Sequence, residues 1–221
     1  MDLKIVQSGL IEITKEEGVK DSRPSSSLII TNGCNVLIDT EHPKEDGVEF
    51  EQALLRTGLS FDDVDYIIFT HLHPDHMGHK DKFRNAVFIF QGSERFTFYF
   101  KNDKKLVLNG SCLLRFKKSC EPVVKYTSDI PDLALLDDKL YIHLIPGHTM
   151  GSIVIFASIN KKVHAFAGDA FLNKDYFERM EPPGSSWDPS RIPEQLLFIK
   201  ENADVIIPGH GELITIDRLK N

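Results

Sequence analysis

The sequence predicts an α/β protein in which strands and helices alternate through two similar halves. Apolar runs rich in β-branched residues, such as 64–70 and 163–167, have the composition of buried strands. Short polar segments that carry histidine or aspartate follow several of these runs directly. The length of 221 residues, with 41% hydrophobic and 27% charged residues, suits one globular domain with a sizeable core. We therefore expect a single domain over residues 1–221.

The first half is predicted to contain strands at 3–14, 27–30, 36–39, 64–70 and 87–90, and a helix at 46–58. Asn32-Gly33 separates two of these strands and is a strong hairpin turn signal. The helix is indicated by spaced apolar residues and by Gly58 at its end. The run 64–70 (VDYIIFT) leads straight into a polar segment, which places that segment on a loop at the carboxyl end of a strand.

The second half is predicted to contain strands at 140–145, 153–157, 163–167 and 205–207, and a short helix at 194–202. Between the halves, about 92–136 holds short strand-like runs (FTFYF, KLVL, CLLRF and VVKY) separated by polar turns, and we expect this part to be an insert. Residues 181–190 (EPPGSSWDPS) form a loop that is long enough to lie over a site.

The net charge is −7, so general binding to nucleic acid or membranes is disfavoured. Residues 95–125 are an exception, with eight Lys or Arg against two acidic residues. The three cysteines, Cys34, Cys112 and Cys120, are odd in number and form no CxxC, so we expect reduced, buried thiols and a cytoplasmic location. The sequence has neither a signal-peptide core at its start nor a run of the ~20 apolar residues that span a bilayer, so no membrane partner is expected.

Metal-ligand residues occur at four places, each just after an apolar strand. Because the ends of such strands meet at one edge of a sheet, residues far apart in sequence can converge there. The ligand candidates are His71, His73, Asp75, His76, His148, Asp169 and His210.

The spacing within the first cluster indicates two ions. His71 and His73 lie two apart on an extended segment, so their rings can point the same way. Asp75 and His76 follow Pro74, which turns the chain, and can face a second ion. Seven ligands are too many for one tetrahedral ion and suit two ions that share Asp169. Imidazole and carboxylate ligands suit Zn²⁺, and also iron or manganese.

The sequence resembles the metallo-β-lactamase superfamily over nearly its whole length. The resemblance is carried by LIDT (37–40), THLHPDHMG (70–78), PGHTMGS (146–152), AGDAF (167–171) and IIPGHGE (206–212). It implies an αββα sandwich with two metal ions at one edge. By the family pattern His71, His73 and His148 would hold the first ion, Asp75, His76 and His210 the second, and Asp169 would bridge them.

Such a site would make the protein a metal-dependent hydrolase. Two dications lower the pKa of a bridging water, and the resulting hydroxide attacks a carbonyl or phosphoryl centre. Asp75 could accept or return a proton, and Asp39 is expected to orient a ligand or water from outside the site. The substrate stays open between a phosphodiester and a small ester, lactone or thioester. A homodimer is compatible with the sequence.

The best local match within the superfamily is the branch containing metallo-β-lactamase-domain-containing protein one, an animal ribonuclease that acts on histone pre-messenger RNA. GDAF, Ser186-Trp187 and ADVIIPGHG (203–211) carry this likeness. It implies an RNA substrate, for which the basic insert could grip phosphates through Lys104, Lys105, Lys117 and Lys118. A solvated basic face is the alternative. Trp187 is either a hydrophobic plug or a lid that contacts the substrate.

Two other functions remain open from the sequence. A persulfide dioxygenase of the same superfamily would use one iron at His71, His148 and Asp169. A metal-stabilised binding protein without turnover is the other, but a structural site would be closed and would need only four ligands.

Overall fold

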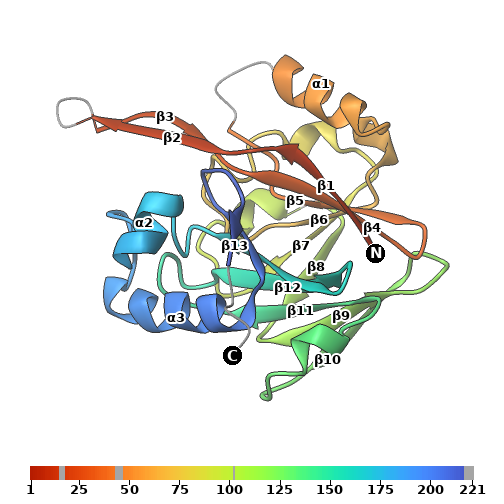
Figure 1. The fold of residues 1–221 in the computed structure, drawn as a ribbon. Helices are drawn as coiled ribbons and strands as arrows, with labels where there is room; N and C mark the ends of the chain where they lie inside the picture. Colours follow the sequence, from red (N-terminus) through yellow and green to blue (C-terminus); the bar gives the residue numbers. More distant parts are fainter. Residues whose placement is uncertain (15–17, 43–46, 102, 217–221) are drawn as a thin grey trace.

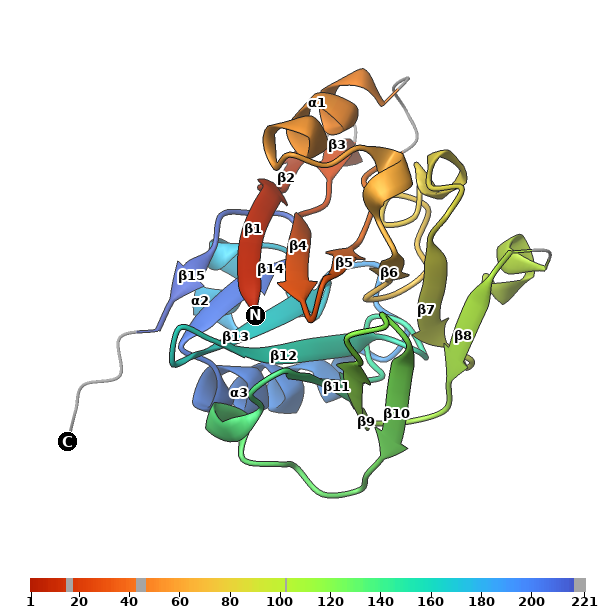
Figure 2. The same cartoon turned by 90° about the vertical axis from the view of Figure 1, so that its right-hand side faces the viewer.

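The computed structural model describes residues 1–14, 18–42, 47–101 and 103–216, which form four layers. Figures 1 and 2 show helix α1 on the outside of one β-sheet, a second sheet behind it, and helices α2 and α3 on the far side. This αββα arrangement confirms the predicted fold class.

The two large sheets divide the chain nearly in half. The first has the order β1-β4-β5-β6-β7-β8 and the second β10-β9-β11-β12-β13-β14-β15, while β2 and β3 form a separate hairpin. The strands are β1 (Asp2–Gln7), β2 (Leu10–Thr14), β3 (Gly18–Arg23), β4 (Ser26–Thr31), β5 (Cys34–Ile38), β6 (Tyr66–Ile68), β7 (Val87–Gln91), β8 (Lys105–Leu108), β9 (Cys112–Phe116), β10 (Pro122–Tyr126), β11 (Lys139–Leu144), β12 (Ile153–Ile159), β13 (Lys162–Gly168), β14 (Val205–Pro208) and β15 (Ile214–Thr215). The helices are α1 (Val48–Arg56), α2 (Lys174–Arg179) and α3 (Ile192–Asn202).

Strand alternation divides the apolar residues among three cores. Val36 and Ile38 of β5 point between the sheets, whereas Leu37 points to the outer face, where α1 packs. On the opposite face, Leu196 and Ile199 of α3 pack against the second sheet. The strands are therefore apolar on both faces, and this is why they read as nearly continuous hydrophobic runs.

Most predicted elements are present, and the turn prediction is confirmed. Asn32 and Gly33 have φ angles of 51° and 82°, as the two central residues of a type I′ turn require. The predicted helix 46–58 is α1, although Asp46 lies outside the described residues. The sequence did not predict β3, α2 or β15.

The strand prediction for FTFYF was wrong, because residues Thr97–Phe100 form a short 3-10 helix. Phe98 and Tyr99 are 52% and 48% exposed, whereas Phe100 is fully buried against Phe69, Phe88 and Phe90. Of the three consecutive aromatic residues 98–100, only Phe100 is buried. A helical turn allows one side chain in three to be buried, whereas a strand with alternating faces would bury Phe98 together with Phe100.

The predicted insert contributes to both sheets. Strand β8 pairs with β7 in the first sheet, and β9 pairs with β11 in the second. Within the described residues, no helix is long and apolar enough to cross a membrane.

The expectation that all three cysteines stay reduced was wrong, since Cys34 and Cys120 form a disulfide between the start of β5 and the β9–β10 turn. Cys112 is a free, buried thiol, as expected. Sequence spacing gave no sign of the pair because its members are 86 residues apart and meet only when the two sheets stack.

Strand direction decides where polar loops gather. Strands β5, β6 and β7 are parallel, and so are β13 and β14, so the carboxyl ends of each set point to the same edge. The β2–β3 hairpin projects to the left in Figure 1. Cys34 is the first residue of β5 and Asp39 follows the last, so the disulfide lies at the opposite end of β5 from Asp39. The loop edge and the disulfide edge are thus on opposite sides of the molecule.

Candidate metal centre

The loops that follow β6, β11, β13 and β14 bring the seven predicted ligands together. Three overlapping groups each have ligand atoms within 4.8 Å of one another: His71 with His73 and His148, His71 with His76 and Asp169, and Asp75 with His76 and His210. Residues from both halves of the chain contribute, so the centre exists only when the halves are packed.

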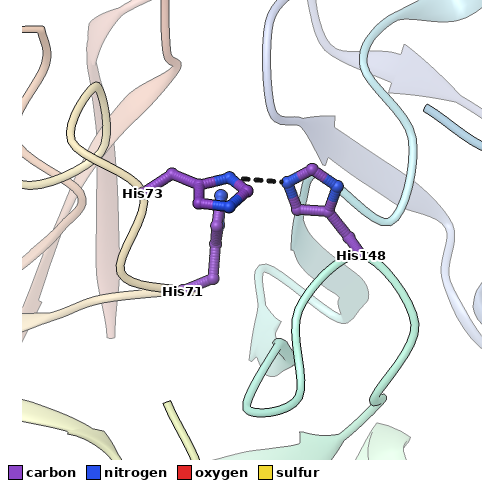
Figure 3. A group of neighbouring side chains, drawn as sticks. All are labelled: His71, His73 and His148. Atoms are coloured by element: carbon purple, nitrogen blue, oxygen red, sulfur yellow. Dashed lines mark hydrogen bonds between the residues drawn. The ribbon is translucent and has the colours of Figure 1, made fainter. Parts of the chain in front are cut away.

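The first group consists of three imidazoles from two loops. Figure 3 shows the rings of His71, His73 and His148 turned toward one another across the gap between their loops. Nδ1 of His73 lies 2.9 Å from Nε2 of His148, and the ring centroids of the three residues are 4.6 to 4.8 Å apart. This is a convergent set of nitrogen donors.

Asp169 lies between two of these groups, the first of His71, His73 and His148 and the second of Asp75, His76 and His210. Its Oδ2 is 3.4 Å from Nε2 of His148 and 4.0 Å from Nε2 of His71. Its Oδ1 is 3.3 Å from Nε2 of both His76 and His210. The two carboxylate oxygens therefore face different groups, which is the arrangement a bridging ligand needs.

Hydrogen bonds at the Nδ1 atoms of His76 and His210 determine which nitrogen of each ring is left to bind a metal ion. Nδ1–H of His76 donates to Oδ2 of Asp39 at 2.8 Å, and Nδ1–H of His210 donates to the Arg23 carbonyl at 3.0 Å. When these rings are neutral, each directs an Nε2 lone pair inward, and the two Nε2 atoms are 3.3 Å apart. Two facing lone pairs repel unless a cation or proton lies between them.

Asp39 orients ligands of both groups. Besides His76, its Oδ2 accepts the Thr70 hydroxyl at 2.7 Å, and its Oδ1 accepts the Thr70 backbone N–H at 2.9 Å. Because the Thr70 proton is directed at Asp39, Thr70 Oγ1 accepts from Nδ1–H of His71 at 3.2 Å. Asp39 is 2% exposed and has a φ of 56°, a conformation that is rare outside glycine.

Burial and carboxylates act in opposite directions on the pKa values of the cluster. Burial lowers the pKa of His148 to about 4 and that of His71 well below its usual value. Burial also opposes protonation of His76, but Asp169, Asp39 and Asp75 outweigh it and raise its pKa. The Asp169 carboxyl is buried as well, yet His210 and His76 hold its pKa well below the ordinary value.

These residues fit a pair of divalent metal ions. Nε2 of His71 and Oδ1 of Asp169 are buried and have no hydrogen-bond partner of good geometry among the described residues. Buried polar atoms rarely go unpaired, so their presence together marks a ligand position. Imidazole nitrogens and carboxylate oxygens are donors for zinc, iron or manganese, with no donor that favours one of them.

The glycines of the ligand loops are required for close approach. A Cβ on Gly209 would overlap Oδ1 of Asp169, and one on Gly168 would lie 2.6 Å from Thr70 Oγ1. Gly168 also has a φ of 49°. The GD and GH pairs of the sequence thus reflect backbone that must pass directly beside a ligand or its support.

The sequence did not reveal Glu94, which joins the two ligand loops. This carboxylate is 5% exposed, accepts the Thr149 hydroxyl, and is hydrogen-bonded by the backbone of Leu72 and Gly151. Burial is the main reason that its pKa is raised. Nothing around QGSE in the sequence indicates this role, because the contacts come from two segments 20 to 60 residues away.

Two cavities open onto the centre and share His73 and Ser185. The smaller, of about 190 Å³, is lined by His73, Glu94, Arg95, Phe96, His148, Thr149, Met150, Ser185 and Trp187. The larger, of about 570 Å³, is lined by Ile11, Ile13, Gly18, Val19, Ser22, His42, His73, Asp75, Asp169, Leu172, Tyr176, Pro183, Gly184, Ser185 and His210. The β2–β3 hairpin supplies the apolar wall of the larger cavity, and Ser22 donates to Oδ2 of Asp75 at 2.8 Å.

The structure brings Trp187 to the centre but not the four predicted lysines. Trp187 lines the smaller cavity, and its backbone N–H donates to the His148 carbonyl at 2.9 Å. Lys105 pairs with Phe88, near the start of β7, and Lys104 comes just before it. Arg95 and Phe96 of the cavity follow the other end of β7, so the two lysines lie at the far end of this strand from the cavity.

Lys117 and Lys118 lie in the β9–β10 turn, beside the disulfide at the far edge. A strand's two ends face opposite edges of its sheet, so a basic sequence run need not be near the site.

Comparison with known proteins relates this chain to a family of metal-dependent proteins. Residues 20–210 match the model of the metallo-β-lactamase superfamily. Metallo-beta-lactamase domain-containing protein 1 of Xenopus laevis is 30% identical over 193 residues, which cover 84% of this chain and 70% of that protein. A protein of Methanocaldococcus jannaschii with the name "probable metallo-hydrolase" is 29% identical over 218 residues, covering 98% of this chain and 90% of that one.

Solved structures share the fold. A B. thuringiensis protein with N-decanoyl-L-homoserine bound at its active site superposes with a TM-score of 0.66, covering 94% of this chain and 92% of that chain. The sequence identity is 20%, so the likeness concerns the fold.

Proposed function

The chain belongs to the metallo-β-lactamase superfamily, and from this we propose that it is a dinuclear, zinc-dependent hydrolase of small esters, lactones or thioesters. The observation that carries the proposal is the position of Asp169, whose two oxygens face two separate groups of histidines. A second complete ligand group is what distinguishes a two-metal site from a one-metal site.

His71, His73 and His148 would hold one ion, and Asp75, His76 and His210 the other, with Asp169 between them. When bound, such a pair of ions supplies ionised water near neutral pH and stabilises the negative charge that develops on the substrate. The protein's own contribution is the fixed orientation of the ligands, through Asp39 and Thr70, and a cavity on each side of them.

Asp75 is the residue placed to hold and return a proton. It lines the larger cavity, and Ser22 donates to its Oδ2. Burial opposes ionisation, but His76 and His210 lower the Asp75 pKa, so the carboxylate is ionised and able to accept a proton. A proton held there is within reach of a leaving group that occupies the larger cavity.

The sizes and linings of the cavities support a small carbonyl substrate over RNA. Both cavities lie under the 183–187 loop or the β2–β3 hairpin, and Arg95 is the one Lys or Arg among their described lining residues. Several cationic contacts would be expected for a phosphate backbone, and the lysines that could have supplied them lie at the other edge.

The two alternative functions each leave part of the centre unexplained. A single iron at His71, His148 and Asp169 gives no role to the group of Asp75, His76 and His210. A structural metal would be enclosed by four ligands, whereas His73, Asp75 and His210 here line an open cavity.

The test is a substrate panel with a matched pair of aspartate variants. The metal content of protein purified without added metal is measured by mass spectrometry, and this protein is assayed on a homoserine lactone, S-lactoylglutathione, bis-p-nitrophenyl phosphate and an RNA oligomer. We expect two zinc ions per chain and turnover of a carbonyl substrate. Asp169→Asn should lose zinc and at least about a hundredfold of the rate, while the exposed Asp62→Asn should match the wild type.

Wild-type rates in Asp169→Asn would show that the bridging assignment is wrong. One iron per chain with oxygen uptake on glutathione persulfide would establish the dioxygenase. Cleavage of the RNA oligomer alone would replace the proposed substrate class.

A further inference from the structure

The smaller cavity is lined by Arg95, an arginine that forms no ion pair with the acidic residues that the structure describes. We propose that this cavity, here called the Arg95 pocket, binds an anionic group of the substrate through Arg95. The inference rests on the proposed hydrolase function and narrows its substrate class to small esters, lactones or thioesters that also carry a carboxylate or phosphate.

The Arg95 pocket lies directly against the first ligand group. The Phe96 ring packs edge-on to the His73 ring, with centroids 6.4 Å apart. On the other wall, the Trp187 backbone N–H donates to the His148 carbonyl. A group bound in the pocket therefore lies next to the reacting centre, where its position decides how the scissile bond is presented.

Arg95 has no ion-pair partner among the residues that the structure describes, and it is an exposed residue that lines the pocket. Carboxylates within 2.7 to 3.3 Å pair with four other arginines, Arg23, Arg115, Arg179 and Arg191. Arg56 and Arg84 also form no ion pair among the described residues, but they line neither cavity at the metal centre. A free guanidinium with five donors binds a planar carboxylate or a phosphate at two points.

Glu94 holds the Arg95 segment in place. Its buried carboxylate is hydrogen-bonded by Thr149, by Leu72 and by Gly151, which belong to the two loops that carry the first ligand group. The backbone of Arg95 and Phe96 is thus tied to the metal centre, so that less conformational entropy is lost when a ligand binds.

The apolar walls of the Arg95 pocket indicate which part of the substrate lies next to the anionic group. Phe96, Met150 and Trp187 are apolar or aromatic, and the volume of about 190 Å³ suits one ring or a short chain, since a cavity of ~150 Å³ holds benzene. The Arg191 guanidinium lies 5.8 Å from the Trp187 ring and helps to fix that wall. The larger cavity has no Lys or Arg among its described lining residues, so the anionic end of the substrate is assigned to the Arg95 pocket.

Binding can be measured without turnover because Trp187 is the single tryptophan of the chain. The zinc-loaded protein is titrated with benzoate and with its neutral isostere benzamide, and Trp187 fluorescence is followed. We expect saturable binding of benzoate that is weakened at least about tenfold in Arg95→Gln, as for loss of a charge-assisted pair. Benzamide binding should not change, and the exposed Arg84→Gln should behave as the wild type.

Equal affinity for benzoate and benzamide, or benzoate binding that survives in Arg95→Gln, would overturn the assignment. Benzoate binding that survives in Arg95→Gln would indicate that the carboxylate binds at zinc instead of at Arg95, because this variant leaves the metal ligands intact.

A pair of esters then tests specificity. The mono-4-nitrophenyl ester of glutaric acid and 4-nitrophenyl pentanoate differ mainly in the terminal carboxylate. Arg95→Gln should lower kcat/KM at least about tenfold for the anionic ester only. An equal loss on both esters would refute the specificity role. If the wild type hydrolyses neither ester, the hydrolase proposal fails for these substrates, while the fluorescence result still decides the anion site.

Discussion

At the scale of single residues, one buried aspartate determines the orientation of ligands in both groups. Asp39 contacts His76 directly and reaches His71 through the Thr70 hydroxyl. Its positive φ of 56° is held by the loop around it, since the Asp39 N–H donates to the Ile68 carbonyl and its own carbonyl accepts from Ser26. The strained backbone places one carboxylate where two imidazoles need it.

Replacing Asp39 with Asn should weaken zinc binding by about 10–100-fold. Both carboxylate oxygens of Asp39 accept hydrogen bonds, so the NH2 group of an amide would face a donor, either the Thr70 backbone N–H or the His76 and Thr70 side chains. Zinc affinity is measured by competition with a chromophoric chelator, and circular dichroism checks that the fold is kept. Asp129→Asn, at an exposed position, is the matched control. An unchanged zinc affinity in a folded Asp39→Asn protein would remove Asp39 from the ligand support.

At the scale of elements, each helix contributes one apolar stripe to an outer core. In α1, Leu54 is fully buried on the first sheet, with Phe50 and Ala53, whereas the next residue, Leu55, is 52% exposed. Gly47, in the left-handed conformation, precedes the first helical residue, and Glu49 and Glu51 in the first turn interact favourably with the helix dipole. Most of its stability nevertheless depends on the buried stripe.

Leu54→Ala and Leu55→Ala form a matched pair within α1. Leu54→Ala should lower the free energy of unfolding by about 2–5 kcal/mol, through lost burial and a cavity. Leu55→Ala should change it by no more than about 0.5 kcal/mol. Urea denaturation of both variants measures the difference, and similar losses at the two positions would mean that α1 does not pack as described.

At the scale of the whole molecule, the two sheets are joined at both edges by different means. The loop edge is joined by the ligand residues and by Glu94, which contacts both ligand loops. The opposite edge is joined by the Cys34–Cys120 disulfide, by the Tyr66 hydroxyl donating to the Cys120 carbonyl, and by Asn32 donating to the Phe116 carbonyl. Loss of either connection should leave the other in place.

Removal of the disulfide should therefore lower stability while sparing the metal centre. Cys34→Ser/Cys120→Ser should lose about 2–4 kcal/mol of unfolding free energy, as expected for a link that closes a long loop. The variant should bind zinc with wild-type affinity. Reducing agent should destabilise the wild type to the level of the variant and leave the variant unchanged. A loss of zinc affinity in the variant would show that the two edges are coupled.

The ligand set could be predicted because each ligand directly follows an apolar strand, and strand ends converge at a sheet edge. His71 and His210 are 139 positions apart in sequence, but both positions are visible as polar residues after β-branched runs. Local patterns also revealed α1 and α3, and the Asn32-Gly33 dipeptide revealed the turn. The binding role of Lys104, Lys105, Lys117 and Lys118 could not be judged in this way. A basic run in the sequence shows that charge is present, but it does not show at which edge of the sheet that charge lies.

The sequence by itself determined the fold class, the family and the ligand candidates, because local patterns of apolar and polar residues dictate strands, helices and the loops between them. Only the tertiary structure decided that Glu94 joins the ligand loops, that Arg95 lines the cavity beside them without an ion pair to any described residue, and that Cys34 meets Cys120. These contacts join segments that have no common sequence pattern. They depend on how two sheets stack, and it is burial of the core between the sheets that brings these distant side chains together.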